Sequence, residues 1–300
     1  MKKIGLIGLG KMGLNLAQNM LDNKFEIVGF DINPENVDSL VSFGGQGANS
    51  LEDLVDKLPE QKIIWVMVPS GKVTEETIGS LSKLLKAEDI IIDGGNSNYN
   101  DSLKNYHRLK DLSIDFLDVG TSGGISGARN GANLMIGGDK NVFDKVEWIF
   151  EGVAQKDGYL YVGEAASGHY LKMVHNGIEY GMMQAIGEGF DLLEHSPYEY
   201  DYEKVANLWN NGSVIRSWLI EIAADAFKED PNLDEIEGVM YSSGEGKWMV
   251  EDALDRQVSI PVITTSLMMR YRSLEKDTFT GKVVASLRKG FGGHDVKKTK

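Results

Sequence analysis

The 300-residue sequence contains no cysteine. It can therefore form no disulfide, no thiolate metal site and no cysteine nucleophile. It also lacks an apolar run long enough to cross a bilayer. The apolar run at the N-terminus is short and interrupted by glycines, which favours a first strand over a signal peptide. We expect a cytoplasmic protein without a membrane segment.

Positive charge is also scarce, because 31 Lys and Arg residues stand against 45 Asp and Glu residues, for a net charge of −14. This balance opposes non-specific attraction to nucleic acid or to an anionic membrane, and we expect neither as a partner. An anionic ligand would need lysines, arginines or helix N-termini gathered at its site. The length predicts two domains.

A glycine-rich loop follows the first apolar run, KIGLIGL at residues 3–9. Gly8, Gly10 and Gly13 form a G-x-G-x-x-G motif that leads into a helical pattern. In such a motif the first glycine makes a tight turn, the second lets the backbone approach a pyrophosphate, and the third packs the helix on the strand. The phosphates would lie at the helix N-terminus, which favours negative charge.

A second strand-like run at residues 25–30 ends at Asp31. A carboxylate about twenty residues beyond the glycine loop can accept hydrogen bonds from an adenosine ribose. It would repel a 2′-phosphate, and neither Ile32 nor Asn33 supplies a cation. The sequence therefore predicts NAD over NADP. The alternative is that Asp31 only begins the turn Asp-Ile-Asn-Pro.

Further strand-like runs separated by helical patterns predict a mainly parallel sheet covered on both faces. They lie at residues 62–69, 89–97, 114–124, 132–138 and 159–163. Helical patterns dominate afterwards, at 167–194, 200–211, 213–228, 245–257 and 261–276. We predict an α/β protein with an N-terminal Rossmann-like, doubly wound sheet at residues 1–165 and an all-α C-terminal domain at residues 166–300.

Three loops at predicted strand ends are small, polar and glycine-rich: residues 68–72, 94–97 and 121–124. Ligands of doubly wound sheets bind beyond the carboxyl ends of the strands. The loops are therefore candidates for ligand contacts, although each could be a simple turn. The tail KGFGGHDVKKTK, taken by itself, is typical of a solvated chain end.

The stretch 167–184, SGHYLKMVHNGIEYGMMQ, carries four different polar groups at helical offsets of zero, three, four and seven. They are Lys172, His175, Asn176 and Glu179. We expect the apolar residues of the other faces to pack into a core, so that the polar face overlooks a cleft. Those residues are Leu171, Val174, Ile178 and Met182. Gly177 and Gly181 indicate close approach by a ligand or a neighbouring helix. The alternative is a solvated surface face.

Over nearly its whole length the sequence resembles the 6-phosphogluconate dehydrogenases. The resemblance rests on GLIGLGKMGLNLAQNM, VPSGKVT, IIDGGNSNY, DVGTSGGISGARNGANLMIGG, the 167–184 stretch, GEGKW and FGGH. It implies oxidative decarboxylation of 6-phospho-D-gluconate to D-ribulose 5-phosphate and CO2 with reduction of NAD, in the pentose phosphate pathway. Two departures are the single helical unit of a shorter form and the acidic Asp31, which suggests that NADP is used more weakly.

The resemblance also implies roles for individual residues. The catalytic set is Lys172 as general base and Glu179 as general acid, together with His175 and Asn176. The substrate-binding set is Asn96, Ser122, Gly123, Gly124, Tyr180, Lys247, Arg272, Arg288 and His294. The cofactor-binding set is Gly8, Gly10, Lys11, Met12, Gly13, Asp31, Val68, Lys72 and Asn96.

Several points stay open within this resemblance. Tyr180, Lys247 and Arg272 match phosphate binders, and Arg270 competes with Arg272 for that role. Arg288 and His294 match a tail that reaches the active site of a neighbouring subunit, which implies a homodimer or homotetramer. We expect no metal, because no compact cluster of His and carboxylates is seen. His107, His169 and His195 receive no role, and Asp93, Asp115 and Asp118 are expected to end strands.

Two other functions are considered. One is a β-hydroxyacid dehydrogenase that acts on a smaller, non-phosphorylated hydroxy acid without decarboxylation; such enzymes share the glycine loop and the lysine. The other is a non-catalytic dinucleotide sensor, which the presence of both Lys172 and Glu179 opposes.

Overall fold

The structure, a computed structural model, describes residues 2–298. It divides into two compact units, Met1–His175 and Asn176–Lys300, and each is described by itself. The division falls within a long helix that starts in the first unit. The predicted end of the first domain at residue 165 lies just before this helix, and it stays a prediction.

The first unit is built on an eight-stranded sheet with the order β3-β2-β1-β4-β5-β6-β7-β8. Every neighbouring pair is parallel except β6 and β7, which are antiparallel. The strands are β1 (Lys3–Ile7), β2 (Glu26–Phe30), β3 (Gln46–Gly47), β4 (Ile63–Val66), β5 (Ile90–Asp93), β6 (Asp115–Ser122), β7 (Ala132–Gly138) and β8 (Ala154–Gly163). The strand order reverses between β1 and β4, which is where doubly wound sheets bind dinucleotides.

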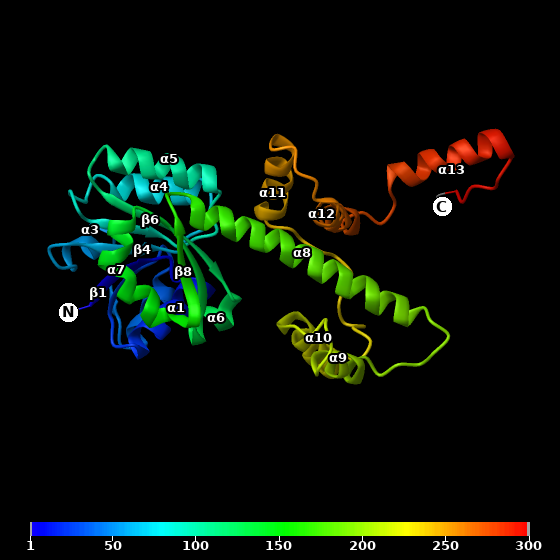
Figure 1. The fold of residues 1–300 in the computed structure, drawn as a ribbon, viewed down its shortest axis with the longest axis horizontal. Helices are drawn as coiled ribbons and strands as arrows, with labels where there is room; N and C mark the ends of the chain where they lie inside the picture. Colours follow the sequence, from blue (N-terminus) through cyan, green and yellow to red (C-terminus); the bar gives the residue numbers. More distant parts are fainter. Residues whose placement is uncertain (1, 299–300) are drawn as a thin grey trace. The chain divides into compact units, whose positions relative to one another are not determined.

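Seven helices of this unit cover the two faces of the sheet (Figure 1). They are α1 (Lys11–Asp22), α2 (Pro34–Ser42), α3 (Leu51–Asp56), α4 (Lys72–Leu81), α5 (Tyr99–Lys110), α6 (Gly124–Asn130) and α7 (Lys140–Val153). Successive strand residues feed two separate cores, as a pleated strand requires. Trp65 packs with α1 and α7 on one face, whereas Ile64 and Val66 pack with α3, α4 and α5 on the other. The predicted Rossmann-like sheet is confirmed.

Helix α8 (Ser167–Glu194) begins in the first unit and continues into the second. The described part of the second unit is otherwise helical, as predicted. Its elements are α9 (Tyr202–Asn210), α10 (Trp218–Glu229), α11 (Gly244–Asp255), α12 (Pro261–Ser273) and α13 (Phe279–Gly292). The sequence did not predict α13, whose hydrophobic side chains are exposed. Across residues 2–298, no helix combines the length and the apolar character that a bilayer crossing requires.

The faces of α8 are the reverse of the expectation. Lys172 and Asn176 are buried, whereas Leu171, Ile178 and Met182 are 40, 52 and 42% exposed. The prediction that these three apolar residues pack into a core is therefore wrong, because Lys172 lies against β6 and Asn176 bonds to α11 instead. His175, Glu179 and the fourth apolar residue, Val174, are partly buried.

Gly177 of α8 is required by helix packing. A Cβ atom on Gly177 would lie 2.1 Å from the sulfur of Met249 in α11. Of the two predicted reasons for a glycine at this position, close approach by a neighbouring helix is the one that the structure shows.

Candidate functional site

The glycine-rich loop connects β1 to α1. Gly8 has a φ of +89°, and a Cβ atom there would lie 2.3 Å from the carbonyl oxygen of Met67. A Cβ atom on Gly13 would lie 1.9 Å from the carbonyl oxygen of Gly8, whereas one on Gly10 would meet no atom within 4 Å. Gly8 and Gly13 are therefore needed for backbone packing, and Gly10 borders open space at the N-terminus of α1. The first-turn N–H groups of a helix have no partner within the helix, so an anion can bind there.

Asp31 lies at the end of β2 and holds the glycine loop. Its Oδ2 accepts a hydrogen bond of 2.6 Å from the backbone N–H of Leu9, and its Oδ1 accepts one of 2.8 Å from that of Asn33. The second bond forms the turn at Asp-Ile-Asn-Pro, which was the alternative interpretation of Asp31. Because each carboxylate oxygen has two lone pairs, Asp31 can also accept hydrogen bonds from ribose hydroxyls. The two interpretations of Asp31 are compatible.

The other predicted cofactor residues lie near the carboxyl ends of β4 and β5 and in the first turn of α1. Val68 Cγ1 lies 3.0 Å from where a Gly8 Cβ would be, so this side chain packs beside the loop. Lys72 begins α4, is exposed, and has its Nζ 3.6 Å from the carboxylate of Glu76. Asn96 is exposed just beyond β5.

Helix α8 is anchored on the sheet by Asp118. One oxygen of this buried carboxylate accepts a hydrogen bond of 2.6 Å from the N–H of Ala166, and the other accepts one of 2.9 Å from the N–H of His169. Burial raises the pKa of Asp118, although the charge of His169 and the two backbone bonds oppose this rise. Asp118 was expected to end a strand. It lies within β6 instead, and it caps the N-terminus of a helix from outside that helix.

Three glycines let the start of α8 lie directly on β6 and β7. A Cβ atom on Gly168 would lie 2.4 Å from the carbonyl oxygen of Met135, and one on Gly137 would lie 2.7 Å from the backbone nitrogen of Gly168. A Cβ atom on Gly120 would lie 2.4 Å from the Cβ of Lys172. These contacts fix Lys172 against β6, where its side chain is only 8% exposed.

His169 is a site residue that the sequence analysis missed. Its ring is buried, with Nδ1 2.7 Å from the hydroxyl oxygen of Ser102 in α5 and Nε2 3.1 Å from the carbonyl oxygen of Gly95. Because a carbonyl only accepts, Nε2 is the donor in the second bond. His169 thus ties the turn before Lys172 to the loop that carries Asn96. The available signal was its position three residues before Lys172, on the same side of the helix.

His175 and Ser122 are also brought together in the first unit. The imidazole Nε2 of His175 lies 3.2 Å from the hydroxyl oxygen of Ser122 at the end of β6. Gly123 and Gly124 follow with φ values of +109° and +59°, a backbone region that favours glycine. The predicted substrate residues of this loop thus share one neighbourhood with the lysine-bearing part of α8.

The second unit holds a separate polar cluster where α8 meets α11 and α12. Asn176 Nδ2 donates a hydrogen bond of 3.1 Å to Oε1 of Glu245, a residue to which the sequence analysis gave no role. The hydroxyl of Tyr180 accepts one of 3.1 Å from the N–H of Ser243. The guanidinium carbon of Arg270 lies 3.7 Å from the centre of the Tyr180 ring.

Four predicted substrate residues are exposed and take no part in these bonds. Lys247 has its Nζ 3.4 Å from the carboxylate of Glu251, and Arg272 donates to the carbonyl of Glu275 at the end of α12. Arg288 lies on α13. His294 follows α13, with its ring 6.3 Å from that of Phe291. Their roles stay predictions, and the two arginines of α12 are distinguished because only Arg270 is placed against Tyr180.

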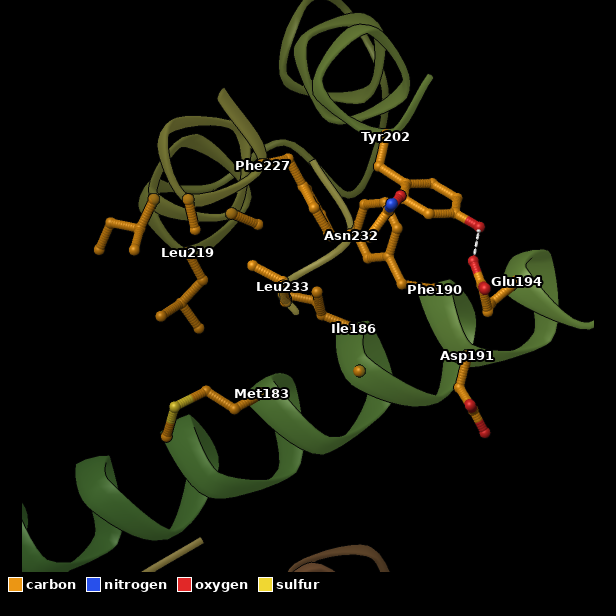
Figure 2. Close-up of a pocket in the computed structure, with 14 residues that line it drawn as sticks. Met183, Ile186, Phe190, Asp191, Glu194, Tyr202, Leu219, Phe227, Asn232 and Leu233 are labelled. Atoms are coloured by element: carbon orange, nitrogen blue, oxygen red, sulfur yellow. Dashed lines mark hydrogen bonds between the residues drawn. The ribbon is translucent and has the colours of Figure 1, made fainter. Parts of the chain in front are cut away.

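A pocket of about 520 Å³ in the second unit has a different character (Figure 2). Met183, Ile186 and Phe190 of α8 face Leu219 and Phe227 of α10 across it. Its lining is mainly hydrocarbon, and Glu194 already accepts a hydrogen bond from Tyr202. Such a lining does not suit a charged, polyhydroxylated ligand.

Within residues 2–298, no group of three His, Asp or Glu side chains is arranged to hold a metal ion.

Comparisons with known protein families match both units. Residues 3–163 match the NAD binding domain of 6-phosphogluconate dehydrogenase, and residues 168–295 match the 6-phosphogluconate dehydrogenase C-terminal domain. The NAD-binding match agrees with the open glycine loop and with Asp31 at the end of β2.

Similar proteins span a range of identities. The chain is 54% identical over 296 residues to a Bacillus subtilis protein that is named only provisionally as a 6-phosphogluconate dehydrogenase, with 99% of each covered. It is 42% identical to the NAD(+)-dependent, decarboxylating 6-phosphogluconate dehydrogenase of Haloferax volcanii, with 98% of each covered. Among solved structures, Plasmodium falciparum 6-phosphogluconate dehydrogenase superimposes with a TM-score of 0.84 at 31% identity, covering 99% of this chain and 66% of that one.

Proposed function

The chain belongs to the 6-phosphogluconate dehydrogenase family, and from this premise we propose that it oxidatively decarboxylates 6-phospho-D-gluconate to D-ribulose 5-phosphate and CO2, with reduction of NAD. The observation that carries the proposal is the polar face of α8, on which Lys172 and Asn176 are buried. Lys172 is anchored on the sheet by Asp118, His169 and Gly120, and Asn176 and Glu179 follow four and seven residues later on the same helix.

The residues of the glycine loop fit a nicotinamide dinucleotide. Gly10 leaves open space at the N-terminus of α1 for a pyrophosphate, and Asp31 has acceptor capacity for a ribose. When bound, the nicotinamide accepts the hydride that leaves C3 of the substrate. The carboxylate of Asp31 disfavours a 2′-phosphate, and on this ground we propose that NAD is preferred over NADP.

Lys172 accepts the proton of the substrate's C3 hydroxyl. To act as a base it must be uncharged at the start, and it takes this proton as the hydride leaves. The product is a 3-keto acid, whose carboxylate departs as CO2 while the bonding electrons move into the carbonyl. Lys172, now an ammonium, stabilises the oxygen that receives them. It passes this proton to that oxygen, which gives an enediol, and takes it back when C1 is protonated and the carbonyl forms again. The reaction thus leaves an extra proton on Lys172 and a proton missing from Glu179, and proton transfer between them, directly or through solvent, resets both.

Glu179 completes the sequence as the general acid. Loss of CO2 leaves an enediol, and Glu179 protonates C1 to give ribulose 5-phosphate. An acid and a base seven residues apart lie on the same face of one helix, so they can serve the same carbon skeleton. His175, Ser122 and Asn176 would orient the hydroxyls and the carboxylate of the sugar acid.

For binding the phosphate group we propose Tyr180 and Arg270, together with Lys247. Lys247 follows Glu245 by two residues on α11. Arg270 replaces Arg272 in this proposal because its guanidinium lies over the Tyr180 ring, whereas Arg272 is exposed and bonded at the end of its own helix. Concentrating a cation at this point offsets the net charge of −14, which otherwise repels an anionic substrate.

We further propose a homodimer or homotetramer in which Arg288 and His294 complete the site of a neighbouring subunit. Leu171, Ile178 and Met182 leave an exposed apolar stripe on α8 that a second copy would cover. Light scattering should give a mass of at least two chains. Deleting the residues beyond Lys289 should raise KM for the substrate strongly, and unchanged kinetics would remove the tail from the site.

A steady-state assay tests the reaction itself. The protein is supplied with 6-phosphogluconate and either NAD or NADP, and both reduced cofactor and CO2 are measured. We expect one CO2 per reduced cofactor and a higher kcat/KM with NAD. Activity only on non-phosphorylated hydroxy acids, without CO2, would overturn the proposal in favour of a β-hydroxyacid dehydrogenase. A higher kcat/KM with NADP would overturn the cofactor preference alone.

A further inference from the structure

The first turn of α11 contains a buried carboxylate whose hydrogen bonding is incomplete. Glu245 is only 2% exposed. Its Oε1 accepts a hydrogen bond of 3.1 Å from Asn176 Nδ2, whereas its Oε2 is buried and has no hydrogen-bond partner. A buried carboxylate oxygen without a partner is costly, and such groups in proteins call for an explanation.

The position of Glu245 at the start of a helix explains only part of this cost. The helix macrodipole favours a negative charge in the first turn. It does not supply a donor to Oε2, which remains without one although α11 begins at Gly244. The exposed Glu221 in the first turn of α10 shows that a glutamate at this helix position can equally face solvent.

The neighbours of Glu245 belong to the proposed substrate residues. Asn176 follows Lys172 by one helical turn. A Cβ atom on Gly246, the next residue after Glu245, would lie 2.6 Å from the ring of Tyr180, and Arg270 covers that ring. Because the amide of Asn176 is planar, its bond to Glu245 directs Oδ1 away from Glu245. The Glu245 carboxylate therefore sets the orientation of a side chain in this cluster.

We propose that Glu245 is a substrate-contacting residue whose Oε2 accepts a hydrogen bond from a hydroxyl of the sugar acid, while its Oε1 orients Asn176. The inference rests on the proposed function, because a polyhydroxylated acid is the ligand that brings hydroxyl donors to this cluster. A site built to bind a hydroxyl group discriminates strongly against ligands that lack it, since its buried polar group is then left unpaired. Glu245 would therefore select for a hydroxyl at one carbon of the chain.

The test is the affinity of the purified full-length protein for 6-phosphogluconate, measured by calorimetry for the wild type, Glu245→Gln and the control Glu221→Gln. Glutamine has the same shape but cannot present two acceptor oxygens. We expect Glu245→Gln to weaken binding of 6-phosphogluconate by about 10- to 100-fold. Binding of NAD should stay within about twofold, because Glu245 is not one of the predicted cofactor-binding residues. Glu221→Gln should match the wild type in both.

Analogues of the substrate that each lack one hydroxyl locate the contact. For one analogue, the wild type and Glu245→Gln should bind equally, because the partner of Oε2 is already missing. Equal affinity of both proteins for the complete substrate would overturn this inference alone. The inference would also be overturned if the ratio of the Kd of Glu245→Gln to the Kd of the wild type were the same for every analogue, because Glu245 would then act only through Asn176. No binding of 6-phosphogluconate to the wild type would overturn the proposed function, and this inference with it.

Discussion

Asp118 in the first unit and Glu245 in the second are both buried carboxylates, but their surroundings differ. Both oxygens of Asp118 accept backbone N–H groups at the start of α8, whereas one oxygen of Glu245 has no partner. Asp118 belongs to a support that is complete without a ligand. Glu245 belongs to a cluster of side chains that a ligand would complete.

The two regions also use different means to position groups. In the first unit, glycines without side chains let α8 lie on β6 and β7 at backbone distance, so that Lys172 is held by contacts of the main chain. In the second unit, contacts between side chains position Asn176, Tyr180 and Arg270. Tyr180 also bonds to the backbone N–H of Ser243, the residue before α11. Substitutions of the glycines and hydrogen bonds that support α8 in the first region should therefore affect stability and turnover together, and substitutions in the second region should affect mainly substrate affinity.

The largest expected effect comes from removing the chemistry while keeping the support. Lys172→Met preserves an unbranched apolar stem but removes the amine. Loss of a general base typically costs about 10²- to 10⁴-fold in kcat. The free energy of unfolding and the Kd for NAD should stay near the wild-type values. Turnover that survives at the wild-type rate would remove Lys172 from the mechanism.

The next effect comes from breaking the support itself. His169→Ala leaves the carbonyl of Gly95 and the hydroxyl of Ser102 without their ring partner. The Ser102 hydroxyl keeps its hydrogen bond of 3.3 Å to the carbonyl of Asn98, so the carbonyl of Gly95 is the group left unpaired. One such group costs about 1–3 kcal/mol, and the cavity left by the buried imidazole adds to this, so we expect a destabilisation of about 2–4 kcal/mol in urea unfolding, together with a lower kcat. His107→Ala, on the exposed side of α5, is the control and should change neither. A variant of His169 with wild-type stability would show that its bonds are dispensable.

Lys172 and His169 differ in whether their roles could be predicted from the sequence. The sheet and the helical second unit were predictable, because apolar strands separated by helical patterns specify layers through local periodicity. The stripe of Lys172, Asn176 and Glu179 was predictable from spacing alone. His169 and Glu245 were not given roles, since each depends on a partner 74 or 69 residues away that no local pattern indicates. The burial of the polar face of α8 was missed for the same reason.

A smaller effect is expected from crowding the contact between β6 and α8. Gly120→Ala would place a Cβ atom 2.4 Å from the Cβ of Lys172 and 2.8 Å from the carbonyl oxygen of Gly168. Overpacking of this kind costs about 1–3 kcal/mol and should lower kcat by shifting Lys172. Gly79→Ala in α4 is the matched control, because its Cβ would meet only the end of Arg108 at 3.6 Å. That control should be neutral or stabilising by up to about 1 kcal/mol.

The smallest effect concerns the pH dependence contributed by Asp118. Because burial raises its pKa in the folded protein, the folded state binds more protons than the unfolded state between the ordinary and the raised pKa. The contribution of Asp118 to stability is therefore fully present below the ordinary pKa and is lost as pH rises through the raised one. Asp118→Asn cannot titrate, so its free energy of unfolding should fall less with rising pH in this window than that of the wild type. Urea unfolding of both proteins over a pH series measures the difference. If the free energy of unfolding of both proteins changed equally with pH, the interactions that lower the pKa of Asp118 would fully offset the effect of burial. The ionised carboxylate under α8 would then not destabilise the fold.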